Sequence, residues 1–326
     1  MRSRSSAIST LRRIARPIPE NLLTGPDCDN VLQYRDLCRF LLFFNLFILS
    51  GPLSAVTVTD ARGVRVHLAS NPTRVMTLAP HLTEWLYALD KQQYLVATVA
   101  YSDFPPAAQS LPKVGDGSNL DYEAILKLQP ELILAWHTGT PLKVIEKLEE
   151  LGFLVYASHV GRLNEFSGEI TRVAKLLGAE KRLPQQLQRF ENRVSLLRQQ
   201  YQDLSKIEVF YLTWLSPLMT INGSHIINDV IELCGGRNIF ADLPNLTPII
   251  DLEALINRSP QLILSTQLNM SGDEFFKHIH WPRISARKRP AYAYVNADYL
   301  SRTSFRMLRG IEETCEFIQE VRVATP

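Results

Sequence analysis

Cysteine is scarce in this chain of 326 residues, and neither sign of charge dominates it. Four cysteines are too few for a small scaffold held together by disulfides. With 46% apolar and 21% charged residues, the chain is neither a disordered tail nor a collagen-like repeat. At roughly 100–200 residues per domain, its length predicts two lobes or one large domain.

The net charge of +2 is too small for a nucleic-acid-binding protein, whose domains are strongly basic. Residues 1–55 hold seven arginines, no lysine and four acidic residues, which leaves 28 basic and 29 acidic residues in 56–326. The basic excess therefore belongs to the first 55 residues, and we expect no nucleic-acid partner.

Common catalytic signatures are also missing. The sequence contains no phosphate-binding Gly-Lys-Ser/Thr loop, no G-x-S-x-G elbow and no H-E-x-x-H motif. Gly115-Asp116-Gly117 lacks the third glycine of a dinucleotide site. His278 and His280 have no third metal ligand nearby and are interpreted as a surface pair. The sequence therefore predicts neither an enzyme nor a metal site.

A short apolar run, Phe40–Leu49, follows Arg35 and Arg39 and precedes a stretch of small residues that ends at Ala55. This pattern is typical of a secretory signal, so residues 1–55 are interpreted as a signal-peptide region with cleavage after Ala55. Ten helical residues span about 15 Å, half of a bilayer core, so we expect no permanent anchor. The alternative is a buried core helix.

The polar segment before this run is longer than a signal peptide needs. We therefore expect translation to begin further along, near Val31, Leu32 or Leu37. The processed chain would lie in the periplasm.

Cys234 and Cys315 are the two cysteines that follow the predicted cleavage site. Because an exported protein meets an oxidising compartment, we expect them to form a disulfide. The alternative is two buried free thiols.

An internal repeat organises the rest of the chain. Residues 121–134 (DYEAILKLQPELIL) and 251–264 (DLEALINRSPQLIL) align at an offset of 130 with seven identities, among them Glu123 and Glu253. Each copy predicts a helix with an acidic first turn, a stop before proline and then a short buried strand. The repeat indicates two related lobes.

Alternating strands and helices predict an α/β fold of two Rossmann-like lobes with parallel sheets, joined by a long rigid helix. The expected ranges are 56–164 for the first lobe, 165–205 for the connecting helix and 206–326 for the second lobe. A ligand is expected in the cleft between the lobes, at the carboxyl ends of the strands.

Aromatic and polar residues follow several of the predicted strands. These are Tyr101, Trp136, Trp214, Asp298 and Arg302. Aromatic walls with a few polar groups are typical of a small-molecule pocket. Taken singly, each aromatic residue is better interpreted as part of a core or a rim, and it is their shared position at the carboxyl ends of strands that favours a pocket.

Five motifs carry a resemblance to a known family over about residues 73–322. They are Tyr101–Pro106 (YSDFPP), 130–136 (PELILAW), 234–240 (CGGRNIF), 258–261 (RSPQ), and Asp298 with Arg302. In these the chain resembles the periplasmic vitamin B12 (cobalamin)-binding proteins of ABC importers, in the helical-backbone class of binding proteins. The resemblance implies a protein that captures cobalamin as its transported ligand and has no cofactor. Its partners would be an inner-membrane permease and its ATPase, and the free protein would be monomeric.

The resemblance also implies roles for individual residues. Tyr101, Trp136, Asp298 and Arg302 match residues that line the corrinoid site. The family has tryptophans where this chain has Gly117 and Thr247, and phenylalanines near Thr213 and Met219, where the adjacent Trp214 is a substitute. These departures leave the affinity and the preferred corrinoid open.

Glu123 and Glu253 match the acidic residues that dock such proteins onto arginine pockets of the permease. The alternative interpretation is that both are first-turn acids favoured by the helix dipole. The disulfide of the family matches Cys234 and Cys315. Two rivals remain: the same fold binding a ferric siderophore or haem, and a metal-dependent enzyme on a nitrogenase-like α/β fold.

Overall fold

The computed structural model describes residues 55–266, 270–280 and 290–324. The predicted signal region and start site fall outside these residues. Within them, no helix is both long enough and apolar enough to cross a membrane.

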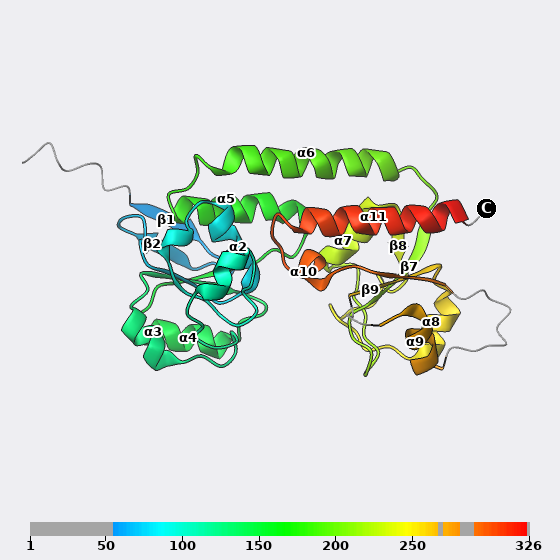
Figure 1. Cartoon of the computed structure of the whole chain (residues 1–326), viewed down its shortest axis with the longest axis horizontal. Helices are drawn as coiled ribbons and strands as arrows, with labels where there is room; N and C mark the ends of the chain where they lie inside the picture. The colour runs from blue at the N-terminus through cyan, green and yellow to red at the C-terminus, as the bar shows by residue number, and fades with distance from the viewer. Residues whose placement is uncertain (1–54, 267–269, 281–289, 325–326) are drawn as a thin grey trace, which may run out of the picture. The chain divides into compact units, whose positions relative to one another are not determined.

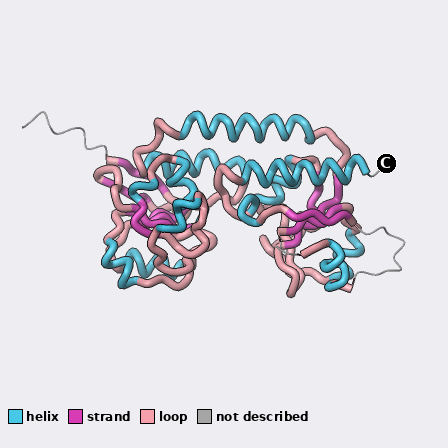
Figure 2. The backbone as a smooth tube through the Cα atoms, viewed as in Figure 1, coloured by secondary structure: helices cyan, strands magenta, loops and turns pink. Residues whose placement is uncertain are grey.

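The first lobe is built on a four-stranded parallel sheet in the order β4-β3-β5-β6. An antiparallel pair of short strands, β1 and β2, precedes it. Figure 2 shows the strands of the two lobes gathered in two separate groups. The elements of this lobe are β1 (Val56–Thr59), β2 (Arg65–Leu68), β3 (Val75–Thr77), α2 (Pro80–Ala88), η2 (Gln92–Tyr94), β4 (Leu95–Ala97), η3 (Pro106–Ser110), α3 (Tyr122–Leu128), β5 (Leu132–Trp136), α4 (Leu142–Glu150) and β6 (Val155–Ser158).

The second lobe has a parallel sheet in the order β10-β9-β7-β8. Its strands again alternate with helices, as the sequence predicts. The elements are β7 (Ile207–Leu212), α7 (Ile226–Leu233), β8 (Gly236–Asn238), α8 (Leu252–Arg258), β9 (Leu262–Ser265), α9 (Gly272–His278), β10 (Ala291–Tyr294), α10 (Ala297–Leu300) and α11 (Met307–Ala324).

Between the two sheets in the sequence, the chain forms two helices within the helical connector predicted over 165–205. A short turn, η4 (Leu163–Glu165), leads into α5 (Phe166–Leu176), and α6 (Leu183–Tyr201) follows. Gly178 interrupts the helical run with a φ of +59°, a conformation that favours glycine. Figure 1 shows α6 running beside α11.

The sequence repeat is also a structural repeat. Asp121 and Asp251 each cap their helix, and their carboxylates accept the N–H of Ala124 and Ala254 at 2.9 and 2.6 Å. Both helices end in a left-handed residue immediately before a buried proline, since proline disfavours helix at the position before it. Helices α3 and α8 thus occupy equivalent positions ahead of β5 and β9.

Each sheet buries both faces, as parallel sheets generally do. One face of the first sheet packs on α3 and α4, and one face of the second packs on α8 and α9. The other two faces share a continuous core with α5, α6 and α11. In that core, the rings of Phe166, Phe190 and Phe305 lie 4.8–6.0 Å apart and join both connecting helices to the second lobe.

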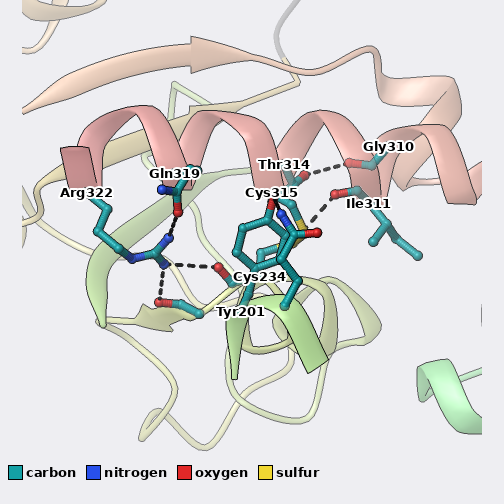
Figure 3. The surroundings of a disulfide bond; sticks show 10 residues. Tyr201, Cys234, Gly310, Ile311, Thr314, Cys315, Gln319 and Arg322 are labelled. Carbon is teal, nitrogen blue, oxygen red and sulfur yellow. Dashed lines mark hydrogen bonds between the residues drawn. A yellow bond between two sulfur atoms is a disulfide. The ribbon is translucent and has the colours of Figure 1, made fainter. Parts of the chain in front are cut away.

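The predicted disulfide between Cys234 and Cys315 is present. Both residues are buried, and the bond joins the end of α7 to the middle of α11 (Figure 3). The Arg322 guanidinium donates to the carbonyl oxygens of Cys234 and Gly235, both at 3.2 Å. The disulfide therefore links helix α7 covalently to the C-terminal helix α11 within the second lobe.

Candidate functional site

A cavity of about 490 Å³ lies between the two lobes, at the carboxyl ends of the strands. Small-molecule sites commonly have volumes in this range. From the first lobe it is lined by His81, Trp136, Thr138, His159, Val160 and Gly161. From the second lobe it is lined by Tyr211, Thr213, Ile221, Ser224, His225, Ile226, Ile227, Leu246, Thr247, Thr266, Leu300, Ser301 and Thr303.

Trp136 ends β5 and is the tryptophan of this lining. Its side chain remains 38% exposed, and its ring packs edge-to-face against His81 at 5.5 Å. The backbone of Trp136 is held by Thr140, whose hydroxyl oxygen accepts the Trp136 N–H at 3.2 Å. The structure thus presents an indole face on a fixed strand end, as the sequence predicts.

The residues of the second lobe that line the cavity carry more hydroxyl groups than those of the first lobe. Thr213 and Thr247, two positions where the resembled family has aromatics, both line the cavity. Tyr211 is buried, and burial raises the pKa of its phenol to about 12. Gly117, a third such position, has a φ of +89° and lies outside this lining. A tryptophan at Gly117 would be strained by that backbone conformation.

The described lining contains no Asp, Glu, Lys or Arg side chain. Its buried histidine, His81, is neutral because burial, together with the nearby charge of Arg302, lowers the pKa of the imidazole to about 3. Burial likewise lowers the pKa of His225 to about 4. At neutral pH these walls offer aromatic faces and neutral polar groups.

Asp298 and Arg302, predicted to contact the ligand, lie outside this lining and bind each other at 2.9 Å. Arg302 also pairs with Asp103 at 2.7 Å and with the buried Glu84 at 3.3 Å. Burial by itself would lower the pKa of Arg302, but the hydrogen bond to Asp103 and the negative charges of Asp298, Asp103 and Glu84 together raise it. The guanidinium therefore belongs to an ion-pair cluster that joins the two lobes.

The same cluster continues along α2. The Glu84 carboxylate accepts the Ser304 hydroxyl at 2.6 Å and the Arg306 guanidinium at 2.9 Å. Beside it, the Trp85 indole donates to the carbonyl oxygen of Thr303 at 2.7 Å. Since Thr303 lines the cavity, this contact fixes the two lobes at one side of the site.

Tyr101 and Trp214 are both exposed, by 77% and 55%, and also lie outside the lining. Tyr101 adopts a φ of +64°, which is uncommon for a residue with a side chain. The Trp214 indole donates to the carbonyl oxygen of Ser216 at 2.9 Å, and the adjacent Thr213 lines the cavity. Their contact with a ligand remains a prediction.

Glu123 and Glu253 occupy the same position in the first turn of α3 and α8. Both side chains are exposed, and within the described part of the chain neither carboxylate forms an ion pair. They are thus open to a partner, and their role in docking remains a prediction.

The described ranges contain no group of three or more His, Cys, Asp or Glu side chains that could hold a metal ion. His278 is exposed and bonds Ser216 Oγ at 3.2 Å, and His280 is also exposed. Their geometry agrees with the interpretation as a surface pair.

Sequence reasoning did not single out the histidines of the cavity, His81, His159 and His225. His159 directly follows β6, and His81 lies four residues beyond β3. The rule that selected Trp136, a polar or aromatic residue at the end of a strand, would also have selected His159. His81 lies inside helix α2, where no such signal marks it.

Comparison with known proteins gives the family. A family model described as periplasmic binding protein matches residues 75–289. A vitamin B12-binding protein of Vibrio parahaemolyticus is 30% identical over 257 residues, 78% of this chain and 93% of the relative. One from Vibrio cholerae is 32% identical over 247 residues, 76% of this chain and 89% of the relative.

Solved structures agree with the predicted fold. The periplasmic vitamin B12 binding protein BtuF of Vibrio cholerae matches with a TM-score of 0.69 and 31% identity, over 77% of this chain and 98% of the other. The periplasmic heme-binding protein RhuT from Roseiflexus sp. RS-1 matches with a TM-score of 0.65 but only 18% identity, over 76% and 98%, and so shares the fold. The prediction of two α/β lobes with parallel sheets is confirmed, and the chain belongs to the periplasmic binding protein family, whose members bind solutes and are not enzymes.

Proposed function

We propose that this protein captures cobalamin, or a related corrinoid, in the cavity between its lobes and delivers it to an ABC permease and its ATPase. Relatives named for vitamin B12 binding, at 30–32% identity over about nine-tenths of their length, support the ligand. The protein would act in the periplasm as a monomer, after removal of its leader.

The uncharged lining of the cavity is the observation that carries this proposal. Ferric hydroxamate and catecholate ligands, and the propionates of haem, bring oxygen-rich or anionic groups that are best bound by arginine or lysine. Cyanocobalamin is neutral overall and carries amide side chains. A wall without Lys, Arg, Asp or Glu fits it, because burying an unpaired charge is costly.

The cavity would enclose one part of the corrinoid, and the other part would project from its mouth. Trp136 would pack on the enclosed part. The exposed rings of Tyr101 and Trp214 would contact the projecting part. Asp298 and Arg302 are already paired with each other, so they would bind polar groups at the edge of the corrinoid only in addition to this existing contact.

Haem remains the second candidate, because three histidines line the cavity and imidazole is a common iron ligand. The likeness to a heme-binding protein does not add to this, since at 18% identity it shows the fold alone.

Titration calorimetry separates these ligands. The protein, purified after expression of the full chain, is titrated with cyanocobalamin, haem and a ferric siderophore. We expect one cyanocobalamin per chain, bound more tightly than micromolar, and weaker binding of the other two. Tight binding of haem or siderophore without cyanocobalamin binding would overturn the proposal.

Delivery would use the paired glutamates. We propose that Glu123 and Glu253 dock onto basic pockets of the permease, one for each lobe. Their equivalent positions on α3 and α8, and their exposure, support this role. Two lobe-related charges suit a two-fold symmetric partner, because they define orientation as well as attraction.

A further inference from the structure

His225 borders the cavity from the second lobe and has one ring nitrogen already in use. Its Nδ1 accepts the backbone N–H of Ile227 at 3.2 Å and so caps the start of α7. Burial keeps the imidazole neutral, with a pKa of about 4. A neutral imidazole that accepts through one nitrogen carries its proton on the other. Nε2 of His225 is therefore an N–H donor.

His159 borders the cavity from the first lobe, directly after β6. Its Nδ1 is buried and has no hydrogen-bond partner among the described residues. An orphaned buried N–H is rare in proteins, whereas an unused acceptor is tolerated more readily. The proton therefore belongs on Nε2, so His159 is also an Nε2–H donor.

Gly161 lies against Nε2 of His159. A methyl group at this glycine would lie only 2.8 Å from Nε2, closer than side chains normally approach. Gly161 and His159 both line the cavity, so Nε2 lies beside a residue of the site.

We propose that His159 and His225 are ligand-binding residues, one on each lobe, that donate their Nε2–H groups to neutral carbonyl oxygens on the rim of the ligand. This rests on the proposed function and names its polar contacts. The amide side chains of a corrinoid supply such acceptors around the whole ring. A ligand held by one donor from each lobe is fixed in orientation across the cavity, and a ligand without acceptors on both sides loses one contact.

The proton positions can be read directly by nitrogen NMR of histidine-labelled, ligand-free protein prepared from the full chain. The proposal requires the Nε2–H tautomer at both His159 and His225. An Nδ1–H tautomer at either residue overturns it.

Binding by variants tests the donors themselves. We expect His159→Leu to weaken cyanocobalamin binding about 10-fold, because a buried acceptor on the ligand loses its donor. His159→Gln retains an N–H donor and should recover most of the loss. Gly161→Ala, which crowds Nε2, should also weaken binding. His225→Asn keeps a helix-capping side chain but shortens its reach, so affinity should fall about 10-fold while α7 remains folded.

The control is His137→Leu, at an exposed histidine whose ring packs on His159 but does not line the cavity. It should leave the affinity unchanged. Unchanged affinity in His159→Leu and His225→Asn, with normal binding by the wild type, overturns this inference and leaves the proposed function standing. Absence of cyanocobalamin binding by the wild type overturns the proposed function and this inference with it.

Discussion

At the scale of single residues, Trp136 carries the largest expected share of ligand binding. It joins a strand end to the cavity and keeps 38% of its side chain exposed. We expect Trp136→Ala to weaken cyanocobalamin binding at least about 10-fold, since a buried aromatic face contributes more than 1 kcal/mol. Calorimetry measures the change.

Trp214→Ala is the matched variant, because Trp214 is another exposed tryptophan after a strand but lies outside the lining. It should cost less affinity than Trp136→Ala. A larger loss at Trp214 would place the ligand at the mouth and not in the cavity.

His81 gives a prediction for pH dependence. Its folded pKa is about 3, whereas an unfolded imidazole titrates near 6.5. Between pH 6.5 and pH 3 the imidazole is protonated in the unfolded chain but not in the native state. The free energy of unfolding therefore keeps the full contribution of His81 above about pH 6.5 and falls as the pH is lowered towards 3. This residue alone contributes a slope of up to about 1.4 kcal/mol per pH unit.

Urea unfolding of the wild type and of His81→Phe at several pH values between 4 and 7.5 tests this. The variant should show a shallower fall in the free energy of unfolding, while His278→Gln, at an exposed position, should match the wild type. Equal slopes for all three proteins would show that His81 is not buried as a neutral base.

The position of Trp136 in the cavity could be predicted from the sequence, because the predicted strand and the motif PELILAW both end at this residue. It could not predict the pairing of Arg302, whose partner Glu84 lies 218 residues away. Such pairs depend on how the two lobes meet, which local periodicity does not encode.

At the scale of elements, the repeated helices α3 and α8 give the docking prediction. We expect Glu123→Lys with Glu253→Lys to abolish cobalamin uptake in cells while leaving its affinity for the purified protein unchanged. The helices should remain folded, because each substitution opposes the helix dipole by only about 0.3–1 kcal/mol.

The control for charge is Glu146→Lys with Glu191→Lys, two exposed glutamates on α4 and α6. It changes the net charge by the same amount at sites outside the repeat. Normal uptake by the Glu123/Glu253 variant, or equal loss in the control, would refute docking through the paired acids.

Elements with strong local signals were predicted closely, and weaker ones were not. Strand β9 lies where the second copy of the repeat predicts a short buried strand, because an apolar run follows the stop before Pro260. Strand β8 could not be predicted from the sequence, because its three residues, Gly236–Asn238, carry little apolar pattern. Its place in the sheet comes from tertiary pairing with β7.

The β1–β2 pair and α9 did have sequence signals. Buried and exposed residues alternate along both strands, around a turn that contains Gly63. Helix α9 begins with a capping box formed by Ser271 and Glu274. The alternating strand pattern and the capping box are therefore sufficient to predict these elements from the sequence.

At the scale of the whole molecule, the disulfide stabilises the second lobe by linking residues 81 positions apart. We expect Cys234→Ala with Cys315→Ala to lower the free energy of unfolding by about 2–5 kcal/mol, as a closed loop of this length restricts the unfolded chain. Urea unfolding measures the loss.

Reduction serves as the internal control for this variant. A reducing agent should bring the wild type close to the stability of the double variant, which itself should not respond. Wild-type protein that unfolds at the same urea concentration with and without reductant would contradict the expected contribution.

The connection between the lobes was only partly predictable. A stiff helical connector follows from composition, but the structure adds the Phe166, Phe190 and Phe305 contacts and the Glu84 ion-pair cluster. These hold the two lobes on either side of the cavity. They favour small lobe movements on ligand binding.

A crystal structure of the protein with cyanocobalamin tests the central claim most directly. We predict one corrinoid between the lobes, with Trp136 packed on it and contacts to the walls that carry His159 and His225. A corrinoid bound elsewhere, for instance in the hollow beside Lys175 and Lys181, would contradict the account.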